Sequence, residues 1–272
     1  MKFRLLNKYE INLSRVQEDL NFCGVKNGKL IIPEKCAPKK REHKGNNFYI
    51  HVHLPKTGGT TFNSVLEDNF DIKYEPFIGR LIHELPYITN EQIERYVVKH
   101  PGMKCLTSHM FRAILPYQST NRNIIAIAVI RNPVDRFFSY YFHMRHRFGV
   151  DCEEKEMKIE EYIKFRINQL GGKPFKGYLN HFCGIENEEA FNYIKALIEN
   201  KHLYIFSTYQ MQEGFDYLKS EFPNDFTKTF FKQENISEKD QEVTDSMKQE
   251  IHKHVSPFDW KLLELAENLV KR

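Results

Sequence analysis

The chain has 272 residues, enough for one large α/β domain with a sizeable core. Its formal charge is only +4, from 40 Lys and Arg against 36 Asp and Glu, so the composition gives no indication of nucleic-acid binding. The five cysteines have no C-x-x-C spacing, which argues against a disulfide framework or a zinc site and favours small buried side chains.

The first 45 residues are predicted to be an N-terminal extension and linker, followed by a main domain at residues 46–272. The extension ends in a charged, turn-rich run at residues 38–45, which is typical of a solvated linker, and residues 29–32 are a candidate edge strand. The residues after Met1 lack an apolar run long enough for a signal peptide or a membrane span. We therefore expect a soluble, cytoplasmic protein.

The first core strand is predicted at residues 48–54, where an apolar, β-branched run ends, and residues 62–69 are compatible with a helix. A strand, a glycine turn and a helix N-terminus together form an anion site, because backbone N–H groups point outward and the helix dipole favours negative charge. The segment therefore predicts a phosphate-binding loop. Its candidate ligand-binding residues are Lys56, Thr57, Gly58, Gly59, Thr60 and Thr61.

The order of residues separates this loop from two common nucleotide loops. The triphosphate loop G-x-x-x-x-G-K-[ST] has its lysine after the glycines, whereas Lys56 precedes Gly58 and Gly59. The dinucleotide pattern G-x-G-x-x-G is absent. The alternative interpretation of a Gly-Gly pair is a plain turn, and the adjacent lysine and threonines favour the anion loop.

Further along, a capping box at residues 89–92 predicts a helix to residue 98, and residues 103–108 predict a short strand. His109 follows that strand and should lie on the same sheet edge as Lys56, where it is a candidate general base. The competing interpretation is a structural or solvated histidine. We interpret His51 and His53, within the first strand, as structural.

A second motif begins with the apolar run 124–130, a strand of the kind buried on both faces of a parallel sheet. Asn132 is a suitable N-cap and Pro133 suits the first helical position, so a helix starts at once. Arg131 then lies at the carboxyl end of a strand, with Ser139 about two turns into the helix. A second phosphate fits between them; alternatively, Arg131 forms a surface ion pair.

The end of this helix is basic, with His143, Arg145 and Arg147. These residues either bind an acidic acceptor or simply complement the helix dipole. Beyond them we predict helices at residues 158–169, 187–200, 210–222 and 256–270, a long polar helix from Ser237, and a strand at 203–206. Strands alternating with helices predict an α/β fold with a central parallel sheet covered by helices on both faces.

Together the two motifs resemble the sulfotransferases that use 3′-phosphoadenylyl sulfate (PAPS), from about residue 48 to the C-terminus. In that family a P-K-T-G-G-T-T loop grips the 5′-phosphosulfate and an R-[DN]-P-x-x-R-x-x-S element grips the 3′-phosphate. The chain is most similar to the glycan enzymes, particularly the heparan and dermatan uronyl 2-O-sulfotransferases, through residues 129–141, His109 and the N-H-F-C-G run at 180–184. It departs from them in T-S-H at 107–109 instead of H-G-H, in Gly58-Gly59 instead of Ala-Ser, and in Asn132 instead of aspartate.

The resemblance implies a P-loop-like sulfotransferase fold and in-line transfer of a sulfuryl group from PAPS, with adenosine 3′,5′-bisphosphate (PAP) as product and no metal. It implies that residues 56–61 bind the 5′-phosphosulfate, that Arg131 and Ser139 bind the 3′-phosphate, and that Lys232 contacts phosphate. His109 would be the base and Lys56 would stabilise the leaving oxygen. The implied acceptor is a hydroxyl of an acidic glycan, bound by His143, Arg145 and Arg147. A Golgi location applies if the chain is a truncated form of an anchored enzyme.

Two other classes of function stay open. A nucleotide-dependent kinase or hydrolase with an atypical loop would need a metal-binding carboxylate after a strand, and no convincing apolar run ends in aspartate. A non-catalytic glycan-binding relative would be favoured if His109 lay far from the Lys56 loop.

Overall fold

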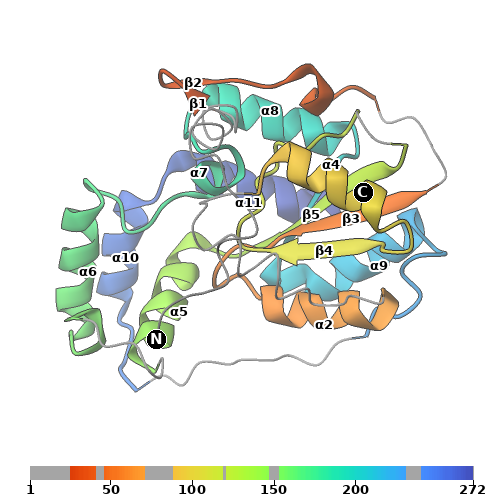
Figure 1. Ribbon diagram of the computed structural model, residues 1–272. Helices are drawn as coiled ribbons and strands as arrows, with labels where there is room; N and C mark the ends of the chain where they lie inside the picture. Colours follow the sequence, from red (N-terminus) through yellow and green to blue (C-terminus); the bar gives the residue numbers. More distant parts are fainter. Residues whose placement is uncertain are drawn as a thin grey trace, which may run out of the picture.

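A computed structural model describes residues 25–40, 46–70, 88–118, 121–146, 153–230 and 240–271. At its centre is a four-stranded sheet in the order β4-β3-β5-β6, in which every neighbouring pair is parallel (Figure 1). The strands are β3 (Asn47–Val52), β4 (Cys105–Ser108), β5 (Asn123–Ile130) and β6 (Leu203–Ser207). All four strands therefore end at the same edge of the sheet, which confirms the predicted parallel α/β architecture.

The sequence explains why β5 lies inside the sheet. All eight of its residues are buried, and its side chains are almost entirely Ile, Ala and Val, which suit a strand covered on both faces. In register, Ala126 lies beside Ile50 of β3 on one side and Leu203 of β6 on the other. The first motif follows β3 and the second follows β5, so this pairing brings the ends of the two motif strands together.

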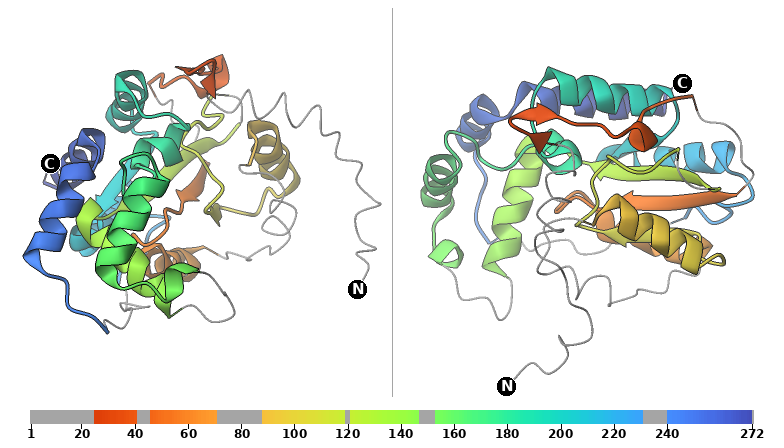
Figure 2. Two further views of the ribbon diagram at one scale, coloured as in Figure 1. Left: turned by 90° about the vertical axis from the view of Figure 1, so that its left-hand side faces the viewer. Right: turned by 45° about the horizontal axis from the view of Figure 1, so that its top comes forward.

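Helices pack against both faces of the sheet. Helices α2 (Gly59–Asn69) and α9 (Met211–Glu221) share one apolar core with the sheet, and α4 (Asn90–Lys99), α7 (Tyr178–Cys183), α8 (Glu188–Glu199) and α11 (Pro257–Leu269) share the other. A third cluster joins α5 (Pro133–Arg145), α6 (Ile159–Gln169) and α10 (Asp245–His254) beside the sheet. These three helices stay together in every view (Figures 1 and 2).

Local capping signals set the starts of several helices as predicted. Thr89 caps α4 in a capping box with Gln92, and the Asn132 side chain accepts the N–H groups of Val134 and Asp135 at the start of α5. Short 3-10 turns at Glu34–Cys36, Glu153–Lys155 and Thr208–Gln210 complete the described helical segments. The three described cysteines are free and buried, as expected.

Other boundaries differ from the sequence predictions. The long polar helix was predicted from Ser237, which lies outside the described residues, but α10 starts at Asp245 with Thr244 as its cap. The edge strand predicted at residues 29–32 is shorter in the structure, where β2 (Lys29–Leu30) pairs antiparallel with β1 (Val25–Lys26). Helix α7 was not predicted, because its six residues fall between two glycines and are too short to show a period.

Part of the predicted extension packs on the domain. Leu30 and Cys36 are buried in the core that contains α8, and the Tyr193 hydroxyl donates to the carbonyl oxygen of Cys36 at 2.8 Å. The domain boundary after residue 45 stays a prediction. Within the described part of the chain, no helix combines the length and apolar character needed to cross a membrane.

Candidate functional site

The predicted phosphate loop joins β3 to α2, and its backbone turns sharply at two residues. Lys56 has a φ of 64° and Gly58 a φ of 85°, both in the left-handed region, and α2 begins at Gly59. The Thr57 hydroxyl donates to the carbonyl oxygen of Leu54 at 2.9 Å, which closes the turn around Lys56. Because Gly58 has no capping side chain, the first N–H groups of α2 keep their capacity to bind an anion.

The start of α2 is packed against a histidine. A Cβ atom at Gly59 would lie 2.1 Å from the imidazole of His53, so any residue other than glycine would require this ring to move. The His53 ring therefore lies against the backbone that is expected to bind phosphate. Of the threonines that follow, Thr60 is exposed and Thr61 is buried.

Two residues distant in sequence hold the loop in place. Arg136 of α5 is buried, and its Nε donates to the carbonyl oxygen of Pro55 at 3.1 Å. The Thr208 hydroxyl, just after β6, lies 2.8 Å from the carbonyl oxygen of Thr57 and 2.9 Å from that of Ile130. Sequence reasoning missed both contacts, because separations of 81 and 151 residues leave no local signal.

Arg131, at the end of β5, lies near the phosphate loop. Burial lowers the pKa of Lys56, and the positive charge of Arg131 lowers it further. The two basic side chains predicted from separate motifs are thus brought together. The Arg131 Nε is buried and has no hydrogen-bond partner among the described residues. Ser139 is half-buried on the α5 helix that Arg131 precedes.

His109 lies at the same sheet edge, in contact with His53. Its Nδ1 is 2.6 Å from the carbonyl oxygen of His53, and the two ring centroids are 4.0 Å apart. Part of His109 is exposed, but burial of the rest lowers its pKa, against the opposing effect of the hydrogen bond to His53. Burial and the nearby His51 lower the pKa of His53 to about 2. Both rings are therefore uncharged near neutral pH.

Helix α7 adds two residues that sequence reasoning did not assign to the site. Burial lowers the pKa of His181 to about 3, with contributions from Arg136 and His109. The Tyr178 hydroxyl accepts the N–H of Arg131 at 3.1 Å and donates to the carbonyl oxygen of the same residue at 2.5 Å. The similarity of the 180–184 run to glycan sulfotransferases pointed to this helix but not to Tyr178.

Of the three residues predicted to bind the acceptor, Arg145 already pairs with another part of the chain. The Arg145 guanidinium donates twice to Asp240, at 3.0 and 2.8 Å, and also to the carbonyl oxygens of Lys155 and Met157. His143 is exposed near the C-terminus of α5. Arg147 and the predicted phosphate ligand Lys232 lie outside the described residues. A role for Arg145 in acceptor binding stays a prediction, and it would require an exchange of partners.

Comparison with known protein families gives one match for this chain. The family model described as "Sulfotransferase domain" matches residues 50–195, which is more than half of the chain and includes both phosphate motifs, His109 and α7.

The chain belongs to the sulfotransferase family.

Two curated relatives are similar to this sulfotransferase chain. A flavonol sulfotransferase-like protein of Flaveria bidentis is 27% identical over 139 residues, covering 48% of this chain and 43% of the relative. The heparan sulfate 2-O-sulfotransferase hst-2 of Caenorhabditis elegans is 25% identical over 212 residues, covering 65% of this chain and 60% of the relative. The sulfotransferase chain thus spans less than two thirds of either relative.

Among solved structures, the mouse sulfotransferase SULT7A1 complexed with PAP aligns with 82% of this sulfotransferase chain and 68% of its own. The TM-score is 0.34 and the sequence identity is 13%.

Proposed function

We propose that this chain is a PAPS-dependent O-sulfotransferase that transfers a sulfuryl group to a hydroxyl of a carbohydrate acceptor. One observation carries the proposal. Lys56 and Arg131 follow two neighbouring strands, and the Thr208 hydroxyl joins their two motifs: it lies 2.8 Å from the carbonyl oxygen of Thr57 and 2.9 Å from that of Ile130. Two adjacent basic groups on one sheet edge suit a donor with two anionic groups, a phosphosulfate and a 3′-phosphate.

The residues at this edge fit such a donor. The backbone of residues 56–59 turns to present N–H groups at the start of α2. The His53 ring lies where a Cβ atom of residue 59 would be, so residue 59 is a glycine and has no side chain that could cover these N–H groups. Lys56, Thr57, Gly58, Gly59, Thr60 and Thr61 would hold the 5′-phosphosulfate. Arg131, whose buried Nε has no hydrogen-bond partner within the described ranges, would hold the 3′-phosphate with Ser139. Lys232 is proposed as a further phosphate contact.

The chemistry assigns separate tasks to His109 and Lys56. The donor supplies a sulfuryl group with phosphate as leaving group, and the acceptor oxygen attacks the sulfur in line. His109 is proposed to take the proton from the acceptor hydroxyl, because a neutral imidazole at a solvent-facing edge can accept one. Lys56 is proposed to stabilise the negative charge that develops on the leaving oxygen.

His53 is a second candidate for the base, because its ring touches the position of Gly59. Its pKa of about 2 makes it a weak proton acceptor near neutral pH, so we favour His109. His109 also contacts His53, whose ring lies against Gly59, and this proximity supports an enzyme over a non-catalytic binding relative.

The nature of the acceptor follows from weaker support. The similarity to a heparan sulfate 2-O-sulfotransferase favours a carbohydrate, and the basic residues His143, Arg145 and Arg147 favour an acidic one. The location of the protein in the cytoplasm is likewise a proposal.

Calorimetry tests the donor assignment. We expect PAP to bind tightly in the presence of a chelator, and ADP and ATP to bind more weakly because they lack the 3′-phosphate. Transfer from PAPS should also continue in the chelator. Equal binding of the three nucleotides, or activity that depends on a divalent metal, would instead favour the kinase or hydrolase alternative.

A further inference from the structure

The backbone of Arg131 is gripped by a side chain from another element. The hydroxyl of Tyr178, 47 residues away, accepts the N–H of Arg131 at 3.1 Å and donates to its carbonyl oxygen at 2.5 Å. Both peptide groups of one residue are thus satisfied by a single oxygen. A buried backbone N–H left without a partner is costly, so this contact fixes the position at which β5 ends.

Tyr178 is itself fixed from several sides. It is fully buried, and its own N–H donates to Asp259 Oδ1 of α11 at 2.7 Å. The guanidinium carbon of Arg136 lies 4.8 Å from the centroid of its ring, and the same Arg136 holds the phosphate loop through Pro55. A Cβ atom at Gly177 would lie 3.0 Å from Asp259 Oδ1, so the chain before Tyr178 is also packed closely.

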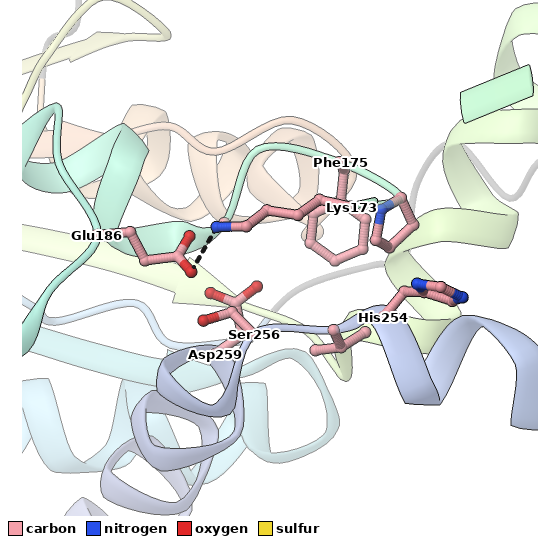
Figure 3. Close-up of a pocket in the computed structure, with 9 residues that line it drawn as sticks. Lys173, Phe175, Glu186, His254, Ser256 and Asp259 are labelled. Atoms are coloured by element: carbon pink, nitrogen blue, oxygen red, sulfur yellow. Dashed lines mark hydrogen bonds and ion pairs between the residues drawn. The ribbon is translucent and has the colours of Figure 1, made fainter. Parts of the chain in front are cut away.

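A pocket adjoins this anchor on the side of Asp259. Figure 3 shows Asp259 and Ser256 opposite the ion pair between Lys173 and Glu186, in which the two charged atoms are 2.9 Å apart. None of the residues predicted for the nucleotide site lines this pocket. The part of this support that comes from Asp259 therefore lies apart from the residues proposed to bind the nucleotide.

We propose that Tyr178 is a positioning residue for the 3′-phosphate: it holds the backbone of Arg131 so that the guanidinium meets that group. The inference rests on the proposed function, in which Arg131 binds the 3′-phosphate. A positioning role differs from the role of a tyrosine that only stabilises the core. A purely structural hydroxyl would affect all nucleotides alike, whereas a positioning hydroxyl affects only ligands that carry a 3′-phosphate.

The test is the affinity of Tyr178→Phe for two ligands, PAP and adenosine 5′-monophosphate, which lacks the 3′-phosphate. We expect the affinity for PAP to fall about tenfold, as for the loss of one hydrogen bond between Arg131 and the 3′-phosphate, with the affinity for the monophosphate nearly unchanged. The preference for PAP therefore falls by the same factor. An equal loss for both ligands, or no loss for either, would overturn the inference.

Tyr193→Phe is the matched control. Tyr193 is also buried, and its hydroxyl donates to a backbone carbonyl oxygen, that of Cys36, at 2.8 Å. This variant should lose similar stability and keep the full preference for PAP. If wild type itself shows no preference for PAP, the proposed function fails together with the inference; if wild type prefers PAP and Tyr178→Phe does so equally, only the inference fails.

A measurement on wild type covers the case in which Tyr178→Phe does not fold. The amide hydrogen of Arg131 should exchange slowly with solvent before any nucleotide is added, because the Tyr178 hydroxyl accepts it. Exchange at the rate of an exposed amide would show that the contact does not form in solution and would overturn the inference.

Discussion

Lys56 combines a strained backbone with a charged side chain. Its φ of 64° is rare for a residue other than glycine and costs of the order of 1–3 kcal/mol. The hydrogen bond from Thr57 to Leu54 and the one from Arg136 to Pro55 hold the turn in place and offset this cost. Since strain of this kind concentrates at functional sites, the conformation agrees with the proposed role of Lys56.

Lys56→Ala should reduce the rate of sulfuryl transfer by a factor of about 10²–10³, because the charge that stabilises the leaving oxygen is lost. Turnover with PAPS is the measurement. Lys201→Ala is the matched control, since Lys201 also has a left-handed backbone, with a φ of 60°, and pairs with Glu221 on the surface. The control should keep wild-type activity. A rate within a few-fold of wild type for Lys56→Ala would rule out the assigned loop.

His109→Ala should lower kcat by about 10²–10⁴-fold and leave the affinity for PAP nearly unchanged. Burial lowers the pKa of His109, and a base acts in its neutral form. The acid limb of the wild-type pH–rate profile should therefore lie below the ordinary value of about 6.5 and disappear in the variant. His53→Ala should keep that limb. The reverse pattern would transfer the role of base to His53.

At the level of elements, the junction of β3 and α2 depends on the absence of side chains. Gly58 has a φ of 85°, and Gly59 has the His53 ring in the place of a Cβ atom. The helix start is therefore uncapped by side chains, whereas Asn132 caps α5 and Asn187 caps α8. Helices α6, α7 and α9 also begin without a side-chain cap, so the open start of α2 is compatible with phosphate binding but does not by itself indicate it.

Gly59→Ala should destabilise the protein by about 1–3 kcal/mol through overpacking and should weaken PAP binding, because His53 must move. Urea unfolding and calorimetry measure the two effects. Gly102→Ala is the control: nothing lies within 4 Å of a Cβ atom there. Wild-type binding by Gly59→Ala would contradict the close contact between His53 and α2.

At the scale of the whole molecule, the C-terminal helix α11 supports the proposed site through a series of hydrogen bonds. Asp259 of α11 holds Tyr178 of α7, which holds Arg131 after β5. Asp259 is buried, and its Oδ2 has no hydrogen-bond partner in the described part of the chain. Burial raises the pKa of Asp259 to about 6, and the nearby Glu186 adds to this, while Tyr178, Arg136 and Lys173 oppose it.

The pKa of Asp259 predicts a pH dependence of stability. Between the ordinary value of 3.8 and about 6, the folded protein holds a proton that the unfolded chain releases. The contribution of Asp259 to the free energy of unfolding therefore falls as the pH rises through this range and is constant above it. Asp259→Asn lacks this titration, so its stability relative to wild type should rise from about pH 4 to about pH 6. Urea unfolding at stepped pH measures the difference.

Asp225→Asn is the control for this trend. Burial raises the pKa of Asp225, but hydrogen bonds from Lys104, Asn47 and Tyr49 outweigh it and lower the pKa below 3.8. Its titration therefore lies below the tested range, and its difference from wild type should stay flat. A flat difference for Asp259→Asn as well would mean that this carboxyl is not buried as described.

The sequence alone was sufficient wherever the controlling interactions are local. The apolar run of β5, the caps at Thr89 and Asn132 and the glycines after Lys56 act within a few residues, so the strand, the helix starts and the glycine turn after β3 could be predicted. The alternation of strands and helices was sufficient for the parallel sheet, because parallel strands require crossovers. The assignment of individual ligands to the residues of these motifs stays a prediction.

Only the tertiary structure decided which distant residues meet at the sheet edge. Arg136 reaches Pro55, Tyr178 reaches Arg131 and Asp259 reaches Tyr178 across 81, 47 and 81 residues. His53, interpreted as structural from its strand, proves to touch both Gly59 and His109. No local pattern encodes such contacts, because they depend on strand order and on how helices pack over the sheet. The sequence indicated each motif separately, and the packing of the helices determines which distant residues support the motifs.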